Sequence, residues 1–264
     1  MARAAHTARH ATPWGWAASG ALLGLLLATV LFAPARWLAA GIQRASGGQV
    51  TLTDARGTVW AGSAQLVLSG GADSQDSMGL PGRVDWRMRP RAAGLSVNVN
   101  SACCMVEAVH LQVVPRWGGM VLRVADHASQ WPAGLLAGLG APWNTIQAQG
   151  RLALSTQGLS VEWARGRTAM QGRMQLDALD MASRLSTLRP MGSYRLTLNG
   201  GTVNQLQLET LQGSLQLTGN GQWVGGRLRF DGMASSTPER LDALSNLLNI
   251  IGRRNGARAI IKVG

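Results

Sequence analysis

The sequence predicts a mainly β protein: a single N-terminal transmembrane helix, then a twisted, curled antiparallel β-meander with one amphipathic helix near the C-terminus. Three observations lead to this fold class. A long segment near the start of the chain carries no charge, and apolar residues alternate with polar ones after residue 46. Glycine accounts for 34 of 264 residues, about 13% against a usual ~7%, which disfavours a mostly helical protein.

The uncharged segment covers residues 13–35 and is rich in leucine. As a helix rising 1.5 Å per residue it would be about 35 Å long, enough to cross a hydrocarbon core of about 30 Å. Arg3 and Arg9 precede it, so the positive-inside rule predicts a cytoplasmic tail over residues 1–12. We expect residues 36–48 to be a linker and residues 49–264 to form one exported, β-rich domain.

A cleaved signal peptide is the competing interpretation of this segment. Ala33-Pro34-Ala35 has the small-x-small form of a cleavage site. The apolar stretch, however, exceeds the roughly 7 to 15 residues of a signal-peptide core, which favours a retained anchor. In both interpretations the bulk of the protein is exported, so no nucleic-acid partner is expected.

The exported part has the period of two that is typical of half-buried strands. Val84, Trp86 and Met88 alternate with charged residues, and the same alternation returns at intervals of 8 to 14 residues up to Phe230. Glycine-containing turn signals such as Asn199-Gly200-Gly201 separate these segments. Closely spaced strands without helical crossovers predict antiparallel pairing.

Two helical interruptions and a last strand complete the expected fold. A short helix is expected over residues 133–139, between Pro132 and Pro142. Thr237 as N-cap and Pro238 at the first helical position open a helix that ends before Gly252. One face of that helix is apolar, formed by Leu241, Leu244, Leu247, Leu248 and Ile251. Residues 259–263 can return as a strand.

The dispersed charge argues against a nucleic-acid-binding protein, and the two cysteines argue against a fold held together by disulfides. The net charge is +12, from 25 basic and 13 acidic residues, and along the sequence the excess is spread out rather than concentrated in a stripe. Cys103 and Cys104 are neighbours. Successive strand residues point to opposite faces, so we expect two unpaired thiols rather than a redox-active bridge.

The residue types needed for catalysis do not form a convincing set. Asp126-His127 with Ser129 is the nearest approach to a hydrolytic triad, and neighbours in one turn cannot be assumed to face each other. Cys103, Cys104 and His110 lack the spaced pairs of a zinc site. We therefore expect no enzyme, no cofactor, no metal and no small-molecule substrate.

Several motifs occur in an order that resembles a known family. Gly57-Thr-Val-Trp60-Ala-Gly62 is followed by Trp86-Arg-Met-Arg-Pro90, and Ala33-Pro34-Ala35-Arg36-Trp37-Leu38 stands at the membrane exit. Trp131-Pro-Ala-Gly-Leu-Leu and the C-terminal Leu-x-x-Ile-Gly252 complete the series. In this order the chain resembles protein N of the bacterial type II (general) secretion pathway, over nearly its whole length.

The resemblance implies an accessory subunit in the bacterial inner membrane, single-pass, with its N-terminus cytoplasmic and its bulk periplasmic. Its implied partners are the inner membrane and other type II secretion subunits, namely the secretin and the inner-membrane platform proteins. The family has no catalytic residues to transfer. The motif residues are expected to be structural, with Trp60 and Trp86 filling the inner face of the sheet; they are Gly57, Trp60, Gly62, Trp86 and Pro90.

Two functions of different class remain open at this point. In the first, the sheet is a scaffold that assists export of folded proteins and contacts other subunits, for example by strand addition. In the second, the sheet is a groove that carries lipid between membranes. A lipid carrier should leave an apolar trough open along the sheet, whereas a scaffold should cover that face with the helix over residues 237–252 and the insert near residue 135.

Overall fold

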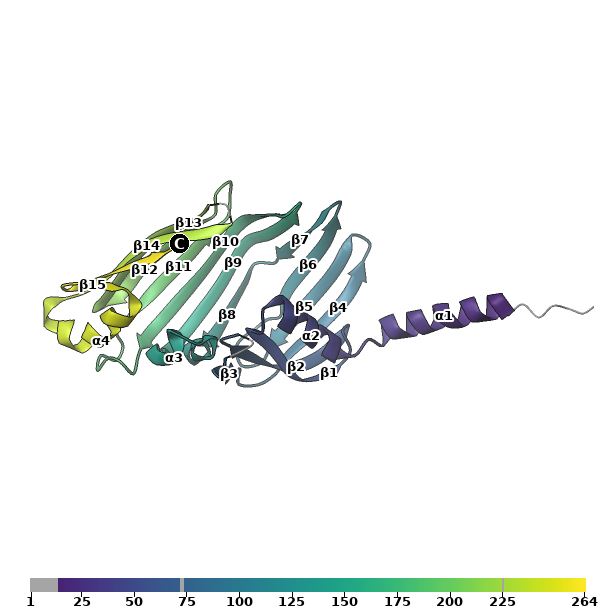
Figure 1. Cartoon of the computed structure of the whole chain (residues 1–264), viewed down its shortest axis with the longest axis horizontal. Helices are drawn as coiled ribbons and strands as arrows, with labels where there is room; N and C mark the ends of the chain where they lie inside the picture. The colour runs from purple at the N-terminus through teal and green to yellow at the C-terminus, as the bar shows by residue number, and fades with distance from the viewer. Residues whose placement is uncertain (1–13, 72–73, 225) are drawn as a thin grey trace, which may run out of the picture.

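The computed structural model describes residues 14–71, 74–224 and 226–264. Figure 1 shows one long curved sheet from which a single helix, α1, projects at one end. The expected cytoplasmic tail over residues 1–12, with Arg3 and Arg9, lies outside the described residues, as does Pro13.

Nearly every strand belongs to an antiparallel meander, as the sequence predicts. The described residues form one 16-stranded sheet with the order β1-β2-β4-β5-β6-β7-β9-β10-β11-β12-β13-β14-β16-β15, while β3 pairs with β2 and β8 with β9. The strands are β1 Val50–Gly57, β2 Ala61–Ser69, β3 Ser77–Gly79, β4 Val84–Arg91, β5 Gly94–Ser101, β6 Val109–Arg116, β7 Gly119–Val124, β8 His127–Pro132, β9 Gln149–Ala164, β10 Arg167–Ala182, β11 Gly192–Asn199, β12 Gln205–Gly213, β13 Leu215–Val224, β14 Arg227–Ser236, β15 Arg253–Asn255 and β16 Arg258–Val263.

The helices lie before the sheet and at one end of its strands (Figure 1). They are α1 Trp14–Leu31, α2 Ala35–Ala45, η1 Ala133–Leu139, α3 Trp143–Ile146, η2 Pro238–Arg240 and α4 Leu241–Ile251, of which η1 and η2 are 3₁₀ helices. Among the described residues α1 alone is long and apolar enough to cross a membrane. The predicted C-terminal helix is confirmed, although the Thr237 hydroxyl makes no capping hydrogen bond.

The segment expected to be a linker is mostly helix α2. Leu38, Ala39 and Ile42 of α2 pack on a cluster that contains Leu52 of β1 and Trp86 of β4. Spacings of one, three and four residues place these side chains on one helical face, while Trp37 and Arg44 remain exposed. The chain therefore passes from α1 into a helix that is already docked on the sheet.

The apolar face of the sheet is covered near the helices. The largest buried cluster joins Leu244, Leu247 and Leu248 of α4 to strand residues such as Leu215 and Ala234. A smaller cluster places Leu135 of η1 against Leu80 and Cys104. Away from the helices the same face is half-buried and belongs to none of the three clusters, for example at Leu122, Leu198, Leu206 and Leu228.

Candidate functional site where α1 meets the sheet

Four of the five family-motif residues meet where α1 reaches the sheet. Gly57 ends β1, Gly62 lies in β2, and Trp60 lies in the turn between these strands. Gly62 is directly opposite Trp86 of β4 in the strand register. The structure thus brings together residues that are up to 29 positions apart in the sequence.

Trp86 is the buried centre of this site. Its side chain is 6% exposed, and its Nε1 donates to the carbonyl oxygens of Val59 at 3.0 Å and Thr58 at 3.3 Å. A Cβ at Gly62 would lie 2.7 Å from Cζ2 of Trp86 and 2.5 Å from the carbonyl oxygen of Arg56. Glycine at position 62 therefore makes room for the indole.

Gly57 is needed for the turn itself. Its φ of +84° lies in the left-handed region, and a Cβ would approach the Ala61 carbonyl oxygen to 2.5 Å. The Thr58 amide donates to that same carbonyl at 2.9 Å and closes the turn. The conformation of the turn over residues 57–61 is thereby fixed.

This turn binds the C-terminal end of α1. Nε1 of Trp60 donates to the Val30 carbonyl oxygen at 2.7 Å, and the Val59 amide donates to the Ala33 carbonyl oxygen at 2.8 Å. Pro34 and Thr58 form an isolated β-bridge. Trp60 is half-buried and lies in the turn, so it does not fill the inner face of the sheet as the sequence led us to expect.

An ion cluster on the neighbouring strands stabilises the same region. Arg83 donates through Nη1 to Oδ2 of Asp54 and through Nη2 to the Asp54 carbonyl oxygen, both at 2.7 Å. Hydrogen bonds from Arg56 and Arg83 hold the pKa of Asp54 below its usual range. Asp54 has a φ of 49° and lies at a register shift of β1, and its carboxylate is bonded to Arg83, the residue before β4.

Pro90 is the motif residue that the structure places elsewhere. It lies near the end of β4, opposite Leu95, and is exposed. It does not belong to the site where α1 meets the sheet.

A scan against protein-family models matches residues 48–261 to the family described as Type II secretion system (T2SS), protein N. The chain belongs to this protein N family. Comparison with curated proteins gives no match, and comparison with solved structures gives none. The match begins just before β1 and ends within β16, so it covers the sheet together with η1, α3, η2 and α4. Helices α1 and α2 precede the matched residues.

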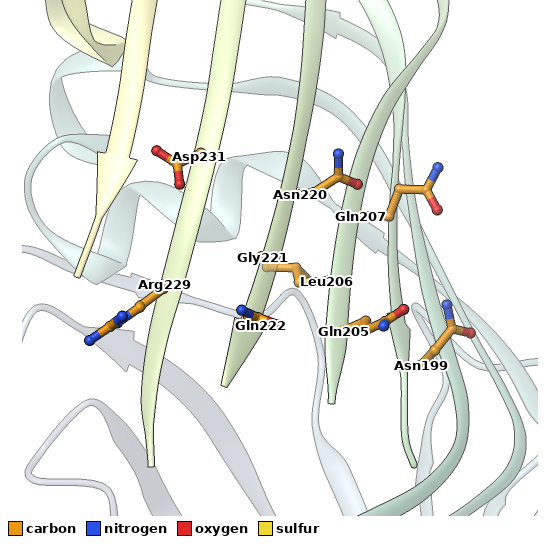
Figure 2. Close-up of a pocket in the computed structure, with 9 residues that line it drawn as sticks. All are labelled: Asn199, Gln205, Leu206, Gln207, Asn220, Gly221, Gln222, Arg229 and Asp231. Atoms are coloured by element: carbon orange, nitrogen blue, oxygen red, sulfur yellow. The ribbon is translucent and has the colours of Figure 1, made fainter. Parts of the chain in front are cut away.

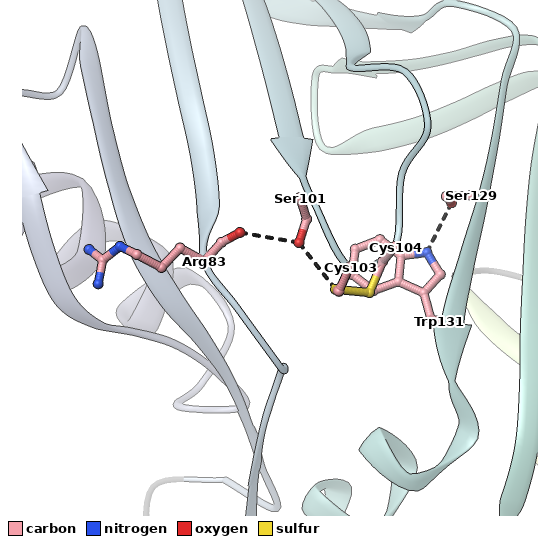
Figure 3. Close-up of a disulfide and its surroundings, with 6 residues drawn as sticks. All are labelled: Arg83, Ser101, Cys103, Cys104, Ser129 and Trp131. Carbon is pink, nitrogen blue, oxygen red and sulfur yellow. Dashed lines mark hydrogen bonds between the residues drawn. A yellow bond between two sulfur atoms is a disulfide. The ribbon is translucent and has the colours of Figure 1, made fainter.

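A disulfide joins Cys103 to Cys104, so the expectation of two unpaired thiols is wrong (Figure 3). That expectation assumed strand geometry. Both residues instead follow β5 in a tight turn, where the amides of Cys104 and Met105 donate to the Ser101 carbonyl oxygen, each at 3.0 Å. Cys104 is buried in the cluster that includes Leu80, whereas Cys103 is exposed.

The disulfide lies beside an interruption in the sheet. β7 pairs with residues 160–164 of β9, and β8 pairs with residues 151–156 of the same strand. On its other side β8 receives the Cys104 turn, because the Gln130 amide donates to the Cys104 carbonyl oxygen at 2.8 Å. Trp131 of β8 packs against the same cluster as Cys104. The cystine turn thus occupies the place where a neighbouring strand would lie.

The possible triad of Asp126, His127 and Ser129 is not assembled. Oδ1 of Asp126 accepts a hydrogen bond from the Gly158 amide at 2.7 Å, and Oγ of Ser129 accepts one from Nε1 of Trp131 at 2.9 Å. Within the described part of the chain, Nε2 of His127 is buried without a hydrogen-bond partner, and burial lowers its pKa. All three residues line a cavity of about 810 Å³ together with Cys103 and Glu107.

The other face of the sheet is polar and hollowed. Side-chain amides and charges line a cavity of about 670 Å³ across β11 to β14 (Figure 2). Its residues stand in register across four strands, since Asn199 pairs with Gln205, Gln205 with Gln222, and Gln222 with Arg229. Farther along this face Arg195 donates to both carboxylate oxygens of Asp177 at 2.8 Å, which lowers the pKa of Asp177.

The three side chains that sequence reasoning considered for zinc do not form a site. Cys103 and Cys104 are bonded to each other, and Nδ1 of His110 contacts Oδ1 of Asn98. Among the described residues no group of three His, Cys, Asp or Glu side chains could hold a metal ion.

Proposed function

We propose that this type II secretion subunit is a membrane-anchored scaffold whose sheet lies in the periplasm and assists export of folded proteins. We further propose that it lies in the inner membrane as a single-pass protein with a cytoplasmic N-terminus, and that it has no catalytic activity. Its proposed partners are the secretin and the inner-membrane platform proteins.

One observation carries the proposal: the motif turn is hydrogen-bonded to the end of α1. Bonds from Trp60 to Val30 and from Val59 to Ala33 fix how the helix enters the sheet. A mobile tether would need no such contacts. The junction suits a protein whose extramembrane part must be held in one direction.

The direction of the sheet supports a scaffold. In Figure 1 the strands succeed one another along roughly the line of α1, so in the proposed anchored subunit the sheet would extend away from the membrane. Fourteen of the described strands lie on one path. At about 4.8 Å per step, they span about 60 Å. Partners at different distances from the membrane could therefore bind the same subunit.

Secretion by cells that lack this chain tests the proposal. Full-length protein should restore export of folded proteins, whereas the sheet supplied with a cleavable signal sequence in place of residues 1–35 should restore it poorly. Mass measurement of the membrane-extracted protein should find residues 13–35 present. Normal secretion in the deletion strain would refute the scaffold function, and a mature chain that starts at Arg36 would refute the anchor.

Lipid transport is the second candidate, because part of the apolar face is uncovered. Half-buried residues such as Leu198, Leu206 and Leu228 lie outside the three buried clusters. One observation favours the scaffold: α4 and η1 cover the apolar face near the helices. Mass spectrometry of lipids retained by the purified protein distinguishes the two functions.

A further inference from the structure

Five hairpin turns lie in a row at the same end of the strands. They join β4 to β5, β6 to β7, β9 to β10, β11 to β12, and β13 to β14. The connections that contain η1, α3 and α4 are at the opposite ends of the strands (Figure 1). This row of strand ends, opposite the helices, is called the tip edge below; it is not an edge strand. It is defined by residues 89–94, 115–120, 162–168, 199–205, 222–224 and 226–229.

Positive charge that is dispersed in the sequence is concentrated on the tip edge. It carries one acidic residue, Glu162, and a net charge of +6, half of the +12 of the whole chain. None of its arginines forms an ion pair with another described residue. Folding therefore creates the basic stripe that the linear sequence does not show. The arginines are Arg89, Arg91, Arg116, Arg165, Arg167, Arg227 and Arg229.

Large apolar side chains are exposed among these arginines. Trp117 is 101% exposed in the turn between β6 and β7. Met120 and Trp163 are paired across β7 and β9 and are 47% and 39% exposed. Tryptophan, methionine and arginine are the residues enriched in protein–protein interfaces, and tryptophan and arginine dominate their binding energy.

A cavity between the β4–β5 and β6–β7 hairpins is suited to carboxylates. It has a volume of about 590 Å³ and is lined by Arg91, Arg116 and Arg123 with no acidic residue. Ser96 and Gln112 add neutral hydrogen-bonding groups. Guanidinium groups bind carboxylates in bidentate geometry, which gives orientation as well as attraction.

We propose that the tip edge binds an acidic surface of another protein, with Trp117 as the apolar anchor and the surrounding arginines as carboxylate ligands. This inference rests on the proposed function, because it identifies the surface by which the scaffold would hold a partner. A protein is favoured over a bilayer by geometry. The row of tips runs along roughly the direction of α1 (Figure 1), so the membrane that α1 crosses cannot contact all five tips.

Photo-crosslinking in secreting cells tests the proposal with the full-length chain. A photoreactive residue replaces Trp117, and the matched control position is Thr187, which is exposed at the opposite ends of the strands. We expect position 117 to crosslink to an identified secretion subunit, through a segment rich in Asp or Glu. Crosslinks of equal yield from both positions, or a position-117 adduct with the mass of a lipid, would overturn the proposal.

Charge substitutions separate a specific contact from chance proximity. Arg116→Glu with Arg165→Glu should lower the crosslink yield about tenfold or more, whereas lysine at both positions should retain most of it. The control pair Arg184→Glu with Arg240→Glu, on exposed arginines of the opposite edge, should leave the yield unchanged. Basic substitutions in the crosslinked acidic segment should restore binding to the glutamate variant.

Two outcomes distinguish failure of this inference from failure of the proposed function. If the deletion strain fails to secrete but the Arg116→Glu, Arg165→Glu variant crosslinks normally, the tip edge is not the binding surface and the scaffold function stands. If the deletion strain secretes normally, the scaffold function fails irrespective of the crosslinks.

Discussion

Trp60 Nε1 lies 2.7 Å from the carbonyl oxygen of Val30, thirty residues earlier in the chain, and donates a hydrogen bond to it. Val30 belongs to the last turn of α1. The final four carbonyl groups of a helix have no partner within the helix, and in an apolar surrounding each such group is costly. The indole therefore satisfies a group at the end of α1 and fixes this helix to the sheet.

Replacing Trp60 by Phe should loosen this junction without unfolding the sheet. Phenylalanine keeps most of the apolar contact but has no donor for Val30. We expect faster hydrogen exchange of the Val59 amide, whose bond to Ala33 is adjacent, and nearly unchanged exchange in β9 and β10. Equal exchange at Val59 in both proteins would show that the Trp60 bond does not hold the junction.

Substituting Gly62 by Ala should destabilise the protein by about 1–3 kcal/mol through overpacking. Its Cβ would meet the backbone of Arg56 at 2.5 Å and the Trp86 ring at 2.7 Å. Gly41→Ala in α2 is the matched control, because its Cβ would have no neighbour within 4 Å. Alanine there should stabilise α2 by up to about 1 kcal/mol. Urea unfolding of both variants checks the opposite signs.

Trp86→Ala should cost about 3–5 kcal/mol, because it leaves a cavity at a side chain that is 6% exposed. Such a loss is large beside a typical stability of ~5–15 kcal/mol, so abundance and protease resistance should fall together with secretion. Trp86→Phe should be milder. An alanine variant that accumulates normally, resists protease and still fails to secrete would mark Trp86 as a partner contact.

The sequence was sufficient to predict most of the sheet and the C-terminal helix. Strand residues such as Leu196, Leu208 and Leu217 alternate with polar neighbours, and an antiparallel meander with short turns follows from that alternation. Helix α2 was missed because its eleven residues follow directly after the membrane segment and include Arg36, Gln43 and Arg44. Only the docked structure shows which face it buries.

The candidate site was only partly predictable, because its contacts also depend on how distant segments dock. The motif named Gly57, Trp60, Gly62, Trp86 and Pro90 without indicating that Pro90 lies apart from the other four. The contact of Trp60 with Val30 depends on the direction in which α1 leaves the sheet. The tip edge was invisible in the sequence because its arginines come from hairpins more than twenty residues apart. The topology of the meander, rather than any local pattern, brings them to one edge.

Thiol labelling should confirm the bond between Cys103 and Cys104. Without reductant neither cysteine should react with a maleimide. After reduction of the folded protein Cys103 should react first, because it is exposed while Cys104 is 5% exposed within an apolar cluster. Labelling of both residues in unreduced protein would show that the thiols are free in the cell.

The pair of Asp177 and Arg195 should make stability depend on acid pH. Arg195 lowers the pKa of Asp177 in the folded state, so the pair stabilises the protein above the ordinary carboxylate pKa of about 4 and this stabilisation is lost as the pH falls through the lowered value. Asp177→Asn should lower the free energy of unfolding at pH 7 by about 1–3 kcal/mol. Its stability should also decline less between pH 5 and pH 2. An unchanged acid profile would contradict the assignment.

The single path of strands also determines how the protein would respond to tension along its length. Successive strand pairs are connected in series along the path, and η1 adds a parallel connection at one end, because Leu66 and Leu68 of β2 pack against the cluster that contains Leu135. Backbone pairing joins β2 to β4 over Ala61–Ala64 and β12 to β13 over Gln205–Leu208, where Thr210 adds side-chain hydrogen bonds to Leu217, whereas β9 and β10 pair along most of their sixteen residues. A pull on the far end would thus load these two short pairings most per residue, and both η1 and Trp86, packed beneath Gly62, reinforce the one nearer α1.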